Sequence, residues 1–199
     1  MKSCLSDDLF GGMAMDAEAV NFLEEKIRKM KPNLIIEFGS GVSTLCLARF
    51  MYELHGDNFK LRVISIDQSE EFAIATELLL KKAQLEKVAK VVAVPLRLQD
   101  VGGVKASCYD FDLLEKSTIF NYGKADFVLI DGPFADENLT RYGVIPKIRS
   151  MVHSNTHFFL DDALRDKELM VANLWRKLPY VKVFGVHFMS KGLLCGKFT

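Results

Sequence analysis

Short apolar runs rich in β-branched residues alternate along this chain with stretches whose apolar residues recur at helical spacing. Strand-like runs lie at 34–36, 61–67, 88–94, 127–130 and 158–160, and the last two are apolar throughout. Continuous apolar runs are typical of parallel strands that are covered on both faces. The alternation therefore predicts an α/β protein with a mainly parallel sheet between two layers of helices.

The helical stretches carry recognisable start and stop signals. The first begins after Asp16, a good N-cap residue, and ends before Pro32. Further helices are predicted over 43–51, 69–82 and 167–178. The first predicted helix has one apolar face to bury, formed by Val20, Leu23, Ile27 and Met30.

The last part of the chain predicts how the sheet ends. Two strand-like runs, 181–188 and 193–198, are joined only by residues 189–192, which is too short for a parallel crossover but suits an antiparallel hairpin. The expected fold is a Rossmann-like three-layer αβα sandwich with a mainly parallel seven-stranded sheet that ends in this hairpin. Residues 96–122, with Gly102 and Gly103, break the rhythm and predict an irregular insertion or lid.

Composition narrows the class of protein. The chain has 199 residues, of which 49% are apolar, and its 26 basic and 26 acidic residues give no net charge. We expect a single domain over 1–199, with residues 1–31 helping to cover the active site. We expect no nucleic-acid partner and no membrane segment. The four cysteines form no zinc motif and suit reduced thiols in the cytoplasm: Cys4, Cys46, Cys108 and Cys195.

Acidic residues follow the predicted strands, where ligands bind in open α/β sheets. They are Glu37, Asp67, Asp131, Asp161 and Asp162. Any one of them could instead be a turn or helix-cap residue. The turn after the first strand contains Gly39 and Gly41, which let a ligand approach the backbone and the next helix N-terminus. Together with Asp67, placed to accept hydrogen bonds from ribose, this turn indicates an adenosine cofactor without specifying which one.

Taken in order, these segments resemble the class I S-adenosylmethionine-dependent methyltransferases, in particular a small bacterial-type subgroup with unassigned acceptor. The resemblance covers nearly the whole chain. It rests on residues 36–44 (IEFGSGVST), 64–67 (ISID), 94–96 (VPL), Tyr109-Asp110, 126–133 (DFVLIDGP), Arg141-Tyr142 and 159–165 (FLDDALR).

The resemblance implies roles for particular residues. Glu37 and the glycine turn would hold the methionine end of the cofactor, Asp67 the ribose, and the loop at Pro95 would border the adenine. Asp131 would lie near the sulfonium and the acceptor, where positioning and proton removal supply most of the catalysis. The implied cofactor-binding residues are Glu37, Gly39, Ser40, Gly41, Ser43, Thr44, Asp67, Gln68, Pro95, Leu96 and Asp131.

A metal is a further hypothesis. Asp131, Asp161 and Asp162 would form a hard oxygen site suited to Mg²⁺ or another divalent cation. This looks like the catechol-type O-methyltransferases, which use two aspartates and an asparagine there. Two departures count against it, since Asp162 replaces the asparagine and Phe134 stands where a lysine base is expected. The alternative is that Asp161 or Asp162 caps the next helix; without a metal, one of the carboxylates would act as the catalytic base.

The acceptor is only partly constrained by the sequence. Arg141, Tyr142 and Arg165 are candidates to bind it, whereas His187 and Trp175 are more typical of an exposed strand residue and a core residue. The predicted function is O-methylation of a small-molecule or glycan acceptor, with a homodimer as one option for the exposed hairpin edge. The alternatives are an NAD(P)-dependent oxidoreductase, which Thr44 and the terminal hairpin disfavour, and a non-catalytic cofactor-binding scaffold.

Overall fold

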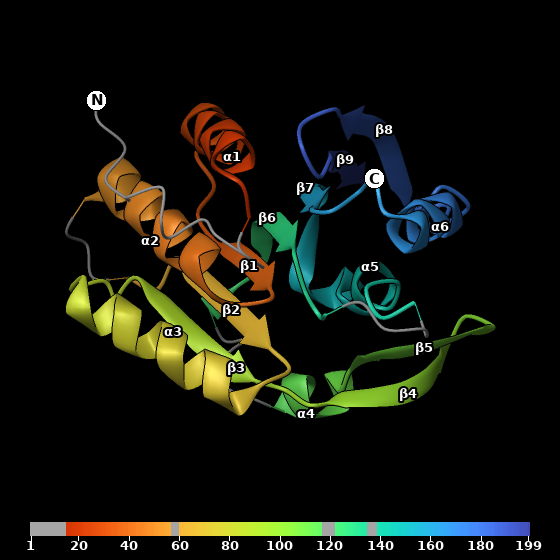
Figure 1. Cartoon of the computed structure of the whole chain (residues 1–199), viewed down its shortest axis with the longest axis horizontal. Helices are drawn as coiled ribbons and strands as arrows, with labels where there is room; N and C mark the ends of the chain where they lie inside the picture. Colours follow the sequence, from red (N-terminus) through yellow and green to blue (C-terminus); the bar gives the residue numbers. More distant parts are fainter. Residues whose placement is uncertain (1–14, 57–59, 117–121, 135–138) are drawn as a thin grey trace.

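The computed structural model describes residues 15–56, 60–116, 122–134 and 139–199, and its centre is a seven-stranded sheet (Figure 1). The strand order is β3-β2-β1-β6-β7-β9-β8. All neighbours from β3 to β7 pair in parallel, whereas β9 runs antiparallel to both β7 and β8. This confirms the predicted Rossmann-like sandwich and its antiparallel end. The strands are β1 (Ile35–Phe38), β2 (Val63–Asp67), β3 (Ala89–Ala93), β6 (Ala125–Ile130), β7 (Val152–Leu160), β8 (Val181–His187) and β9 (Leu193–Phe198).

Helices cover both faces of the sheet. Figure 1 shows α1, α2 and α3 on one side, with α5, α6 and a small second sheet on the other. Each side has its own apolar core: Leu23 and Met51 belong to the first, Trp175 and Phe158 to the second. The helices are α1 (Ala17–Met30), α2 (Val42–His55), α3 (Glu70–Lys82), α4 (Phe111–Lys116), α5 (Val144–Lys147), α6 (Asp166–Trp175) and the short 3₁₀ turn Arg149–Met151.

The predicted helix signals act as expected. The Asp16 carboxylate accepts a hydrogen bond of 2.7 Å from Ala19 N and caps α1. Ser69 caps α3 in the same way, through Phe72 N at 3.3 Å. None of the helices in the described ranges is long and apolar enough to cross a membrane.

Residues 96–116, the described part of the predicted segment 96–122, are more regular than the sequence suggested. They form a second, two-stranded antiparallel sheet of β4 (Leu96–Val101) and β5 (Val104–Tyr109), followed by α4. Gly102 and Gly103 are not a break but the turn itself, because both have positive φ values (63° and 85°), as a tight hairpin turn requires. The prediction of an irregular structure was therefore wrong for residues 96–116.

Candidate active site

The candidate site lies where the strand order reverses. From β1 the chain moves outward to β2 and β3 and then returns to β6 on the other side of β1. Ligands in open α/β sheets bind beyond the carboxyl ends of the strands at such a point. Glu37 and Gly39 at β1, Asp67 at β2, and Asp131 after β6 all lie at this edge.

The turn after β1 touches the loop after β6 backbone to backbone. A Cβ atom on Gly39 would lie 2.7 Å from Gly132 N, and a Cβ atom on Gly132 would lie 2.7 Å from Gly39 Cα. Gly39 also has a φ of 94°, which favours glycine. Only glycine at both positions lets the two loops meet this closely and leaves the strand ends side by side.

Glu37 is fully buried at the end of β1, and one of its carboxylate oxygens is free. Thr44 Oγ1 donates a hydrogen bond of 2.5 Å to Glu37 Oε2 and accepts one of 3.0 Å from Gly41 N. Oε1 has no hydrogen-bond partner among the residues that the structure describes. Burial raises the pKa of Glu37 to about 7, although the hydrogen bond from Thr44 lowers it. A cationic ligand group would satisfy the free oxygen and favour the ionised carboxylate.

Asp67 at the end of β2 holds the glycine turn in place. Its Oδ2 accepts hydrogen bonds from Ser40 N at 2.7 Å and Ser40 Oγ at 2.8 Å, and its Oδ1 accepts one from Ser69 N at 2.8 Å. Oδ1 thus keeps room for a second donor. Asp67 is both a support for the turn and a candidate acceptor for ligand hydroxyls.

The other predicted cofactor residues frame the same edge. Gln68 Oε1 accepts a hydrogen bond of 3.3 Å from Phe134 N, which links the loops after β2 and β6. Pro95 is exposed and Leu96 half-buried, directly after β3. Ser43 and Thr44 are buried in the first turn of α2, so we expect Thr44 to act on a ligand through Glu37 rather than by contact.

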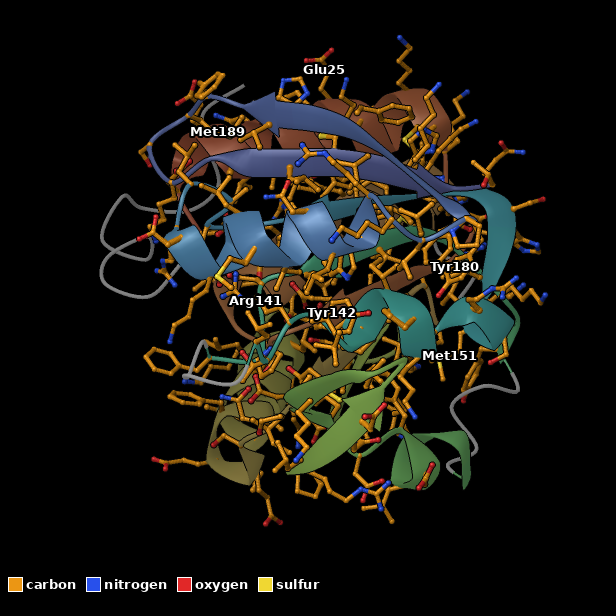
Figure 2. All side chains as sticks on the ribbon, turned by 90° about the vertical axis from the view of Figure 1, so that its right-hand side faces the viewer. Glu25, Arg141, Tyr142, Met151, Tyr180 and Met189 are labelled. Carbon is orange, nitrogen blue, oxygen red and sulfur yellow. The ribbon has the colours of Figure 1, made fainter. Side chains whose placement is uncertain are left out.

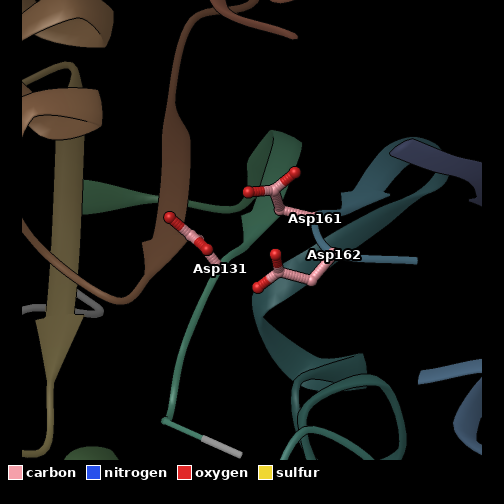
Figure 3. A group of neighbouring side chains, drawn as sticks. All are labelled: Asp131, Asp161 and Asp162. Atoms are coloured by element: carbon pink, nitrogen blue, oxygen red, sulfur yellow. The ribbon is translucent and has the colours of Figure 1, made fainter. Parts of the chain in front are cut away.

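Three aspartates gather at the ends of β6 and β7 (Figure 3). Asp131 follows β6, Asp161 and Asp162 follow β7, and each offers a carboxylate oxygen within 4.8 Å of the others. Asp162 has a φ of 56°, which aspartate tolerates better than most residues. Neither Asp161 nor Asp162 caps α6, because the N-cap is Arg165 and makes no side-chain capping bond. The helix-cap alternative for this pair is therefore wrong.

Arg141 brings a positive charge into this cluster. Its Nη2 lies 3.2 Å from Asp162 Oδ2 and 3.9 Å from Asp131 Oδ1. Its guanidinium also donates to the backbone oxygens of Asp131, Asp161 and Pro133. Figure 2 shows Arg141 and Tyr142 between α6 and α5. Only 4% of the Arg141 side chain is exposed, so the arginine that was predicted to bind an acceptor instead joins the ends of β6 and β7.

Two of the remaining candidates lie mainly in the interior, and two are exposed. Tyr142 is buried in the core, and Trp175 Nε1 donates a hydrogen bond of 3.0 Å to its carbonyl oxygen, so Trp175 is the core residue that its position suggested. The Arg165 side chain is 51% exposed and pairs with Asp162 Oδ2 at 2.9 Å. His187 is exposed at the end of β8, with its ring 4.5 Å from the ring of Phe22.

The electrostatics of the cluster are set by burial and mutual repulsion. Burial raises the pKa of Asp161, and the charges of Asp131 and Asp162 raise it further. Burial likewise raises the pKa of Asp131, while Arg141 and Lys191 lower it. Lys191 belongs to the β8–β9 connection, whose backbone bonds to Ala163 and Leu164 beside the cluster.

A divalent cation fits the spacing of the cluster but not its charge distribution. Oxygens that share one ion lie at most about 4.2 Å apart around Mg²⁺ and about 4.8 Å apart around Ca²⁺, and the aspartate oxygens fall within that upper limit. Arg141, however, already supplies a cation between Asp131 and Asp162. Two unit charges about 4 Å apart interact by about 4 kcal/mol at an effective dielectric constant of about 20. Arg141 would repel a divalent ion about twice as strongly, which offsets part of the attraction of that ion to the three carboxylates.

Two further residues were given no role from the sequence, although Tyr109 belongs to one of the segments that carry the resemblance. Glu168 on α6 is buried with Oε1 3.7 Å from Arg141 Nε. The hydroxyl of Tyr109, at the end of β5, is buried without a hydrogen-bond partner in the described part of the chain, and a Cβ on Gly132 would lie 2.8 Å from it. A first-turn glutamate and a strand tyrosine are ordinary surface residues in sequence; only the packing of α6 and of the second sheet places them here.

Comparison with known proteins shows which of them share this fold. No protein-family model and no curated protein sequence matches the chain. Solved structures do match it. A methyltransferase from Podospora anserina, PaMTH1, bound to SAH, is 15% identical, with a TM-score of 0.69 over 94% of this chain and 80% of that one. The chain has the fold of these methyltransferases.

Two other solved structures share this methyltransferase fold. An O-methyltransferase from Bacillus cereus in complex with SAH is 18% identical, with a TM-score of 0.68 over 96% of this chain and 85% of that one. The O-methyltransferase TomG from Streptomyces achromogenes, in complex with SAM, is 15% identical, with a TM-score of 0.69 over 95% and 83%. The similarity therefore covers nearly the whole chain, as the resemblance in sequence implied.

Proposed function

We propose that this protein is an S-adenosylmethionine-dependent methyltransferase that transfers the methyl group to an oxygen of a small-molecule acceptor. The observation that carries the proposal is the fully buried Oε1 of Glu37, which has no hydrogen-bond partner among the described residues. It lies beside the glycine turn, at the edge where Asp67 ends the neighbouring strand. An adenosine cofactor with an ammonium group supplies a partner for each. The proteins of similar fold that are described as bound to SAM or SAH support the same cofactor.

Different residues of the chain would bind different parts of the cofactor. Glu37 would accept a hydrogen bond from the amino group of the methionine moiety, and Asp67 Oδ1 one from a ribose hydroxyl. Ser40 and the N-terminus of α2 would approach the ligand through their backbone N–H groups, which the missing side chains of Gly39 and Gly41 leave accessible. Pro95 and Leu96 would border the adenine. When bound, S-adenosylmethionine supplies the electrophilic methyl group.

The aspartates supply what the acceptor oxygen needs. Alignment of the acceptor accounts for much of the rate, and its proton must leave as the new bond forms. Asp131 is the least buried of the three, with 18% of its side chain exposed, and it lies next to Gly132 at the reversal point. We therefore assign Asp131 as the residue that faces the acceptor and takes its proton. The raised pKa of Asp131, caused first by burial, makes this carboxylate a stronger base than an exposed aspartate.

The chemical class of the methyl acceptor is a further part of the proposal. The group of carboxylates favours methyl transfer to oxygen over transfer to nitrogen or carbon. Two of the solved structures that share the fold are O-methyltransferases. Either a small metabolite or a glycan hydroxyl would suit this chemistry. Arg165, exposed beside Asp162, is the candidate to contact a hydroxylated or anionic group of that acceptor.

Calorimetric titration with S-adenosylmethionine and S-adenosylhomocysteine tests the cofactor. Asp67→Asn is a sharper variant than Asp67→Ala, because it keeps one oxygen for the turn. The matched control is Asp126→Asn, since Asp126 also binds backbone N–H groups, those of Asn33 and Leu34, but at the opposite end of the strands. We expect binding in the micromolar range, about −8 kcal/mol, that Asp67→Asn weakens at least about tenfold and Asp126→Asn leaves unchanged.

Other outcomes would redirect the proposal. Binding of NAD(P) in place of S-adenosylmethionine would indicate an oxidoreductase. Tight cofactor binding without methyl transfer to any member of a broad panel of hydroxylated acceptors would favour a scaffold role. Failure of the folded protein to bind either adenosine ligand would refute the methyltransferase assignment.

A further inference from the structure

We propose that Arg141 is the resident cation of the aspartate cluster and takes the place that a divalent metal would have between Asp131 and Asp162. The inference rests on the proposed function only in regarding this cluster as the acceptor side of the site. The contacts of Arg141 with the aspartates are made within the folded chain itself. Their test therefore needs neither cofactor nor acceptor.

Every nitrogen of the Arg141 guanidinium is already engaged. Nη1 donates to Asp161 O at 2.9 Å, Nη2 donates to Asp131 O at 2.5 Å, and Nε donates to Pro133 O at 3.2 Å. Nη2 additionally donates to Asp162 Oδ2 at 3.2 Å. A planar guanidinium is suited to such a fork of acceptors, whereas a lysine ammonium is not. Arg141 therefore donates hydrogen bonds to backbone oxygens of the cluster as well as to a carboxylate oxygen.

These contacts make the charge difficult to displace. The side chain is 4% exposed, and moving it away would leave three carbonyl oxygens at the ends of β6 and β7 without their donor. Buried backbone acceptors without partners are costly. Glu168 on α6 contributes a further negative charge, with Oε1 3.7 Å from Nε. The guanidinium is thus close to carboxylates from the strand ends and from α6.

A divalent ion would have to share this space with a fixed positive charge. Of the aspartate oxygens closest to Arg141, Asp162 Oδ2 is already shared between Arg141 and Arg165, and Asp131 Oδ1 lies 3.9 Å from Nη2. Lys191 is a second cation whose charge acts on Asp131. Protein cations therefore neutralise part of the negative charge of the cluster, although Asp162 Oδ1 is buried without a hydrogen-bond partner among the described residues. Asp131 is the most exposed of the three aspartates.

The same reasoning predicts how a metal site could be restored. Arg141→Met alone removes the buried cation, which leaves Glu168 without its ion-pair partner and leaves Asp162 with only the exposed Arg165. The double variant Arg141→Met/Asp162→Asn removes the arginine together with one of its anionic partners, and it leaves two aspartates and an asparagine at the strand ends. This set has the ligand types that we associate above with catechol-type enzymes, so we expect it to bind a divalent cation.

Titration with Mn²⁺, followed by the electron paramagnetic resonance signal of the free ion, tests the proposal. The proteins are the wild type, Arg141→Met, the double variant and Arg165→Met. Arg165→Met is the matched control, because Arg165 pairs with the same Asp162 oxygen but is exposed. We expect no submillimolar binding by the wild type or by Arg165→Met. We expect the double variant to bind Mn²⁺ at least about tenfold more tightly than the wild type.

The outcomes separate cleanly from those of the cofactor titration. Micromolar binding of Mn²⁺ by the wild type, lost in Asp131→Asn, would overturn the proposal. So would a folded double variant that binds Mn²⁺ no better than Arg165→Met. If Arg141→Met does not fold, the wild type and the double variant still decide the question. A protein that binds neither S-adenosylmethionine nor Mn²⁺ would refute the proposed function while leaving the role of Arg141 intact.

Discussion

Gly39 and Gly132 are in direct backbone contact across the point where the strand order reverses. A Cβ on Gly132 would come within 2.8 Å of Gly39 N and of the Tyr109 hydroxyl. Contacts that short require something to move, and two of the nearest neighbours are backbone atoms. The contact therefore fixes how the turn after β1 and the loop after β6 are placed, and with them Glu37 and Asp131.

Gly132→Ala should consequently destabilise the protein by about 2 kcal/mol, as overpacking of a tight contact does. Gly39→Ala should cost more, because its φ of 94° adds backbone strain to the clash. Urea denaturation measures both. Gly102→Ala is the control for backbone strain alone, since Gly102 has a φ of 63° but open space around its Cβ position. If Gly39→Ala costs no more than Gly102→Ala, the close approach of the two loops is not important for stability.

The buried Glu37 carboxyl should make the stability of the ligand-free protein depend on pH. Burial raises its pKa from 4.5 to about 7, so the folded state holds a proton that the unfolded state releases at lower pH. The stabilisation is complete below about pH 4.5 and is lost as the pH rises through about 7, by about 3 kcal/mol at about 1.4 kcal/mol per pKa unit.

Urea unfolding of the wild type and Glu37→Gln at several pH values isolates this effect. The glutamine is neutral at every pH, so the difference in unfolding free energy between the two proteins should change with pH by the amount given above. Asp161, whose pKa burial also raises, contributes to both proteins and cancels in the difference. The charge of Glu37 itself raises the pKa of Asp131, so that part of the pH dependence remains in the difference and belongs to Glu37. Parallel pH profiles would show that Glu37 has the same pKa in the folded and the unfolded protein.

Much of this fold could be predicted because its signals are local. Apolar runs such as 127–130, the cap at Asp16 and the short connection at 189–192 act within a few residues of chain, and the structure places them as expected. The second sheet was missed although β4 (LRLQDV) and β5 (VKASCY) alternate between apolar and polar residues over most of their length, because each run contains only one β-branched residue. In addition, the pair Gly102-Gly103 serves equally well in a loop or in a hairpin turn.

The carboxylates of the site could be predicted from the sequence, but the residues around them could not. Parallel strands must end at one edge, so the gathering of Asp131 and Asp161 follows from topology alone. Arg141 and Glu168 come from segments whose depth depends on how α5 and α6 pack, which no local pattern encodes. For the same reason Tyr142 was assigned to an acceptor, although it follows Arg141 into the core.

The unpartnered Tyr109 hydroxyl should reduce the stability of the ligand-free protein. It is buried without a hydrogen bond to any described residue, and burial raises the pKa of Tyr109 well above 10, which keeps the hydroxyl protonated. Tyr109→Phe should therefore stabilise the protein by about 1 kcal/mol. Thr156→Val is the opposite case, because Thr156 Oγ1 donates to Ala125 O at 2.7 Å and accepts from His153 N at 2.9 Å. Thermal denaturation should shift the two midpoints in opposite directions; a lower midpoint for Tyr109→Phe would mean that the hydroxyl has a partner.

Arg141 and Arg165 share the oxygen Asp162 Oδ2 but should differ widely in their effect on stability. Removing one member of a buried ion pair leaves the other charge uncompensated, and Arg141→Met also leaves three carbonyl oxygens without donors. We expect a loss of about 3–5 kcal/mol for Arg141→Met. Arg165 is half exposed, and water can replace it, so Arg165→Met should change the unfolding free energy by less than about 0.5 kcal/mol. Asp162→Asn in the Arg141→Met background should recover part of the loss, because it removes a buried charge that the first substitution leaves with only the exposed Arg165 as its partner. Equal losses for the two single arginine variants would show that the buried contacts of Arg141 contribute no more to stability than an exposed ion pair does.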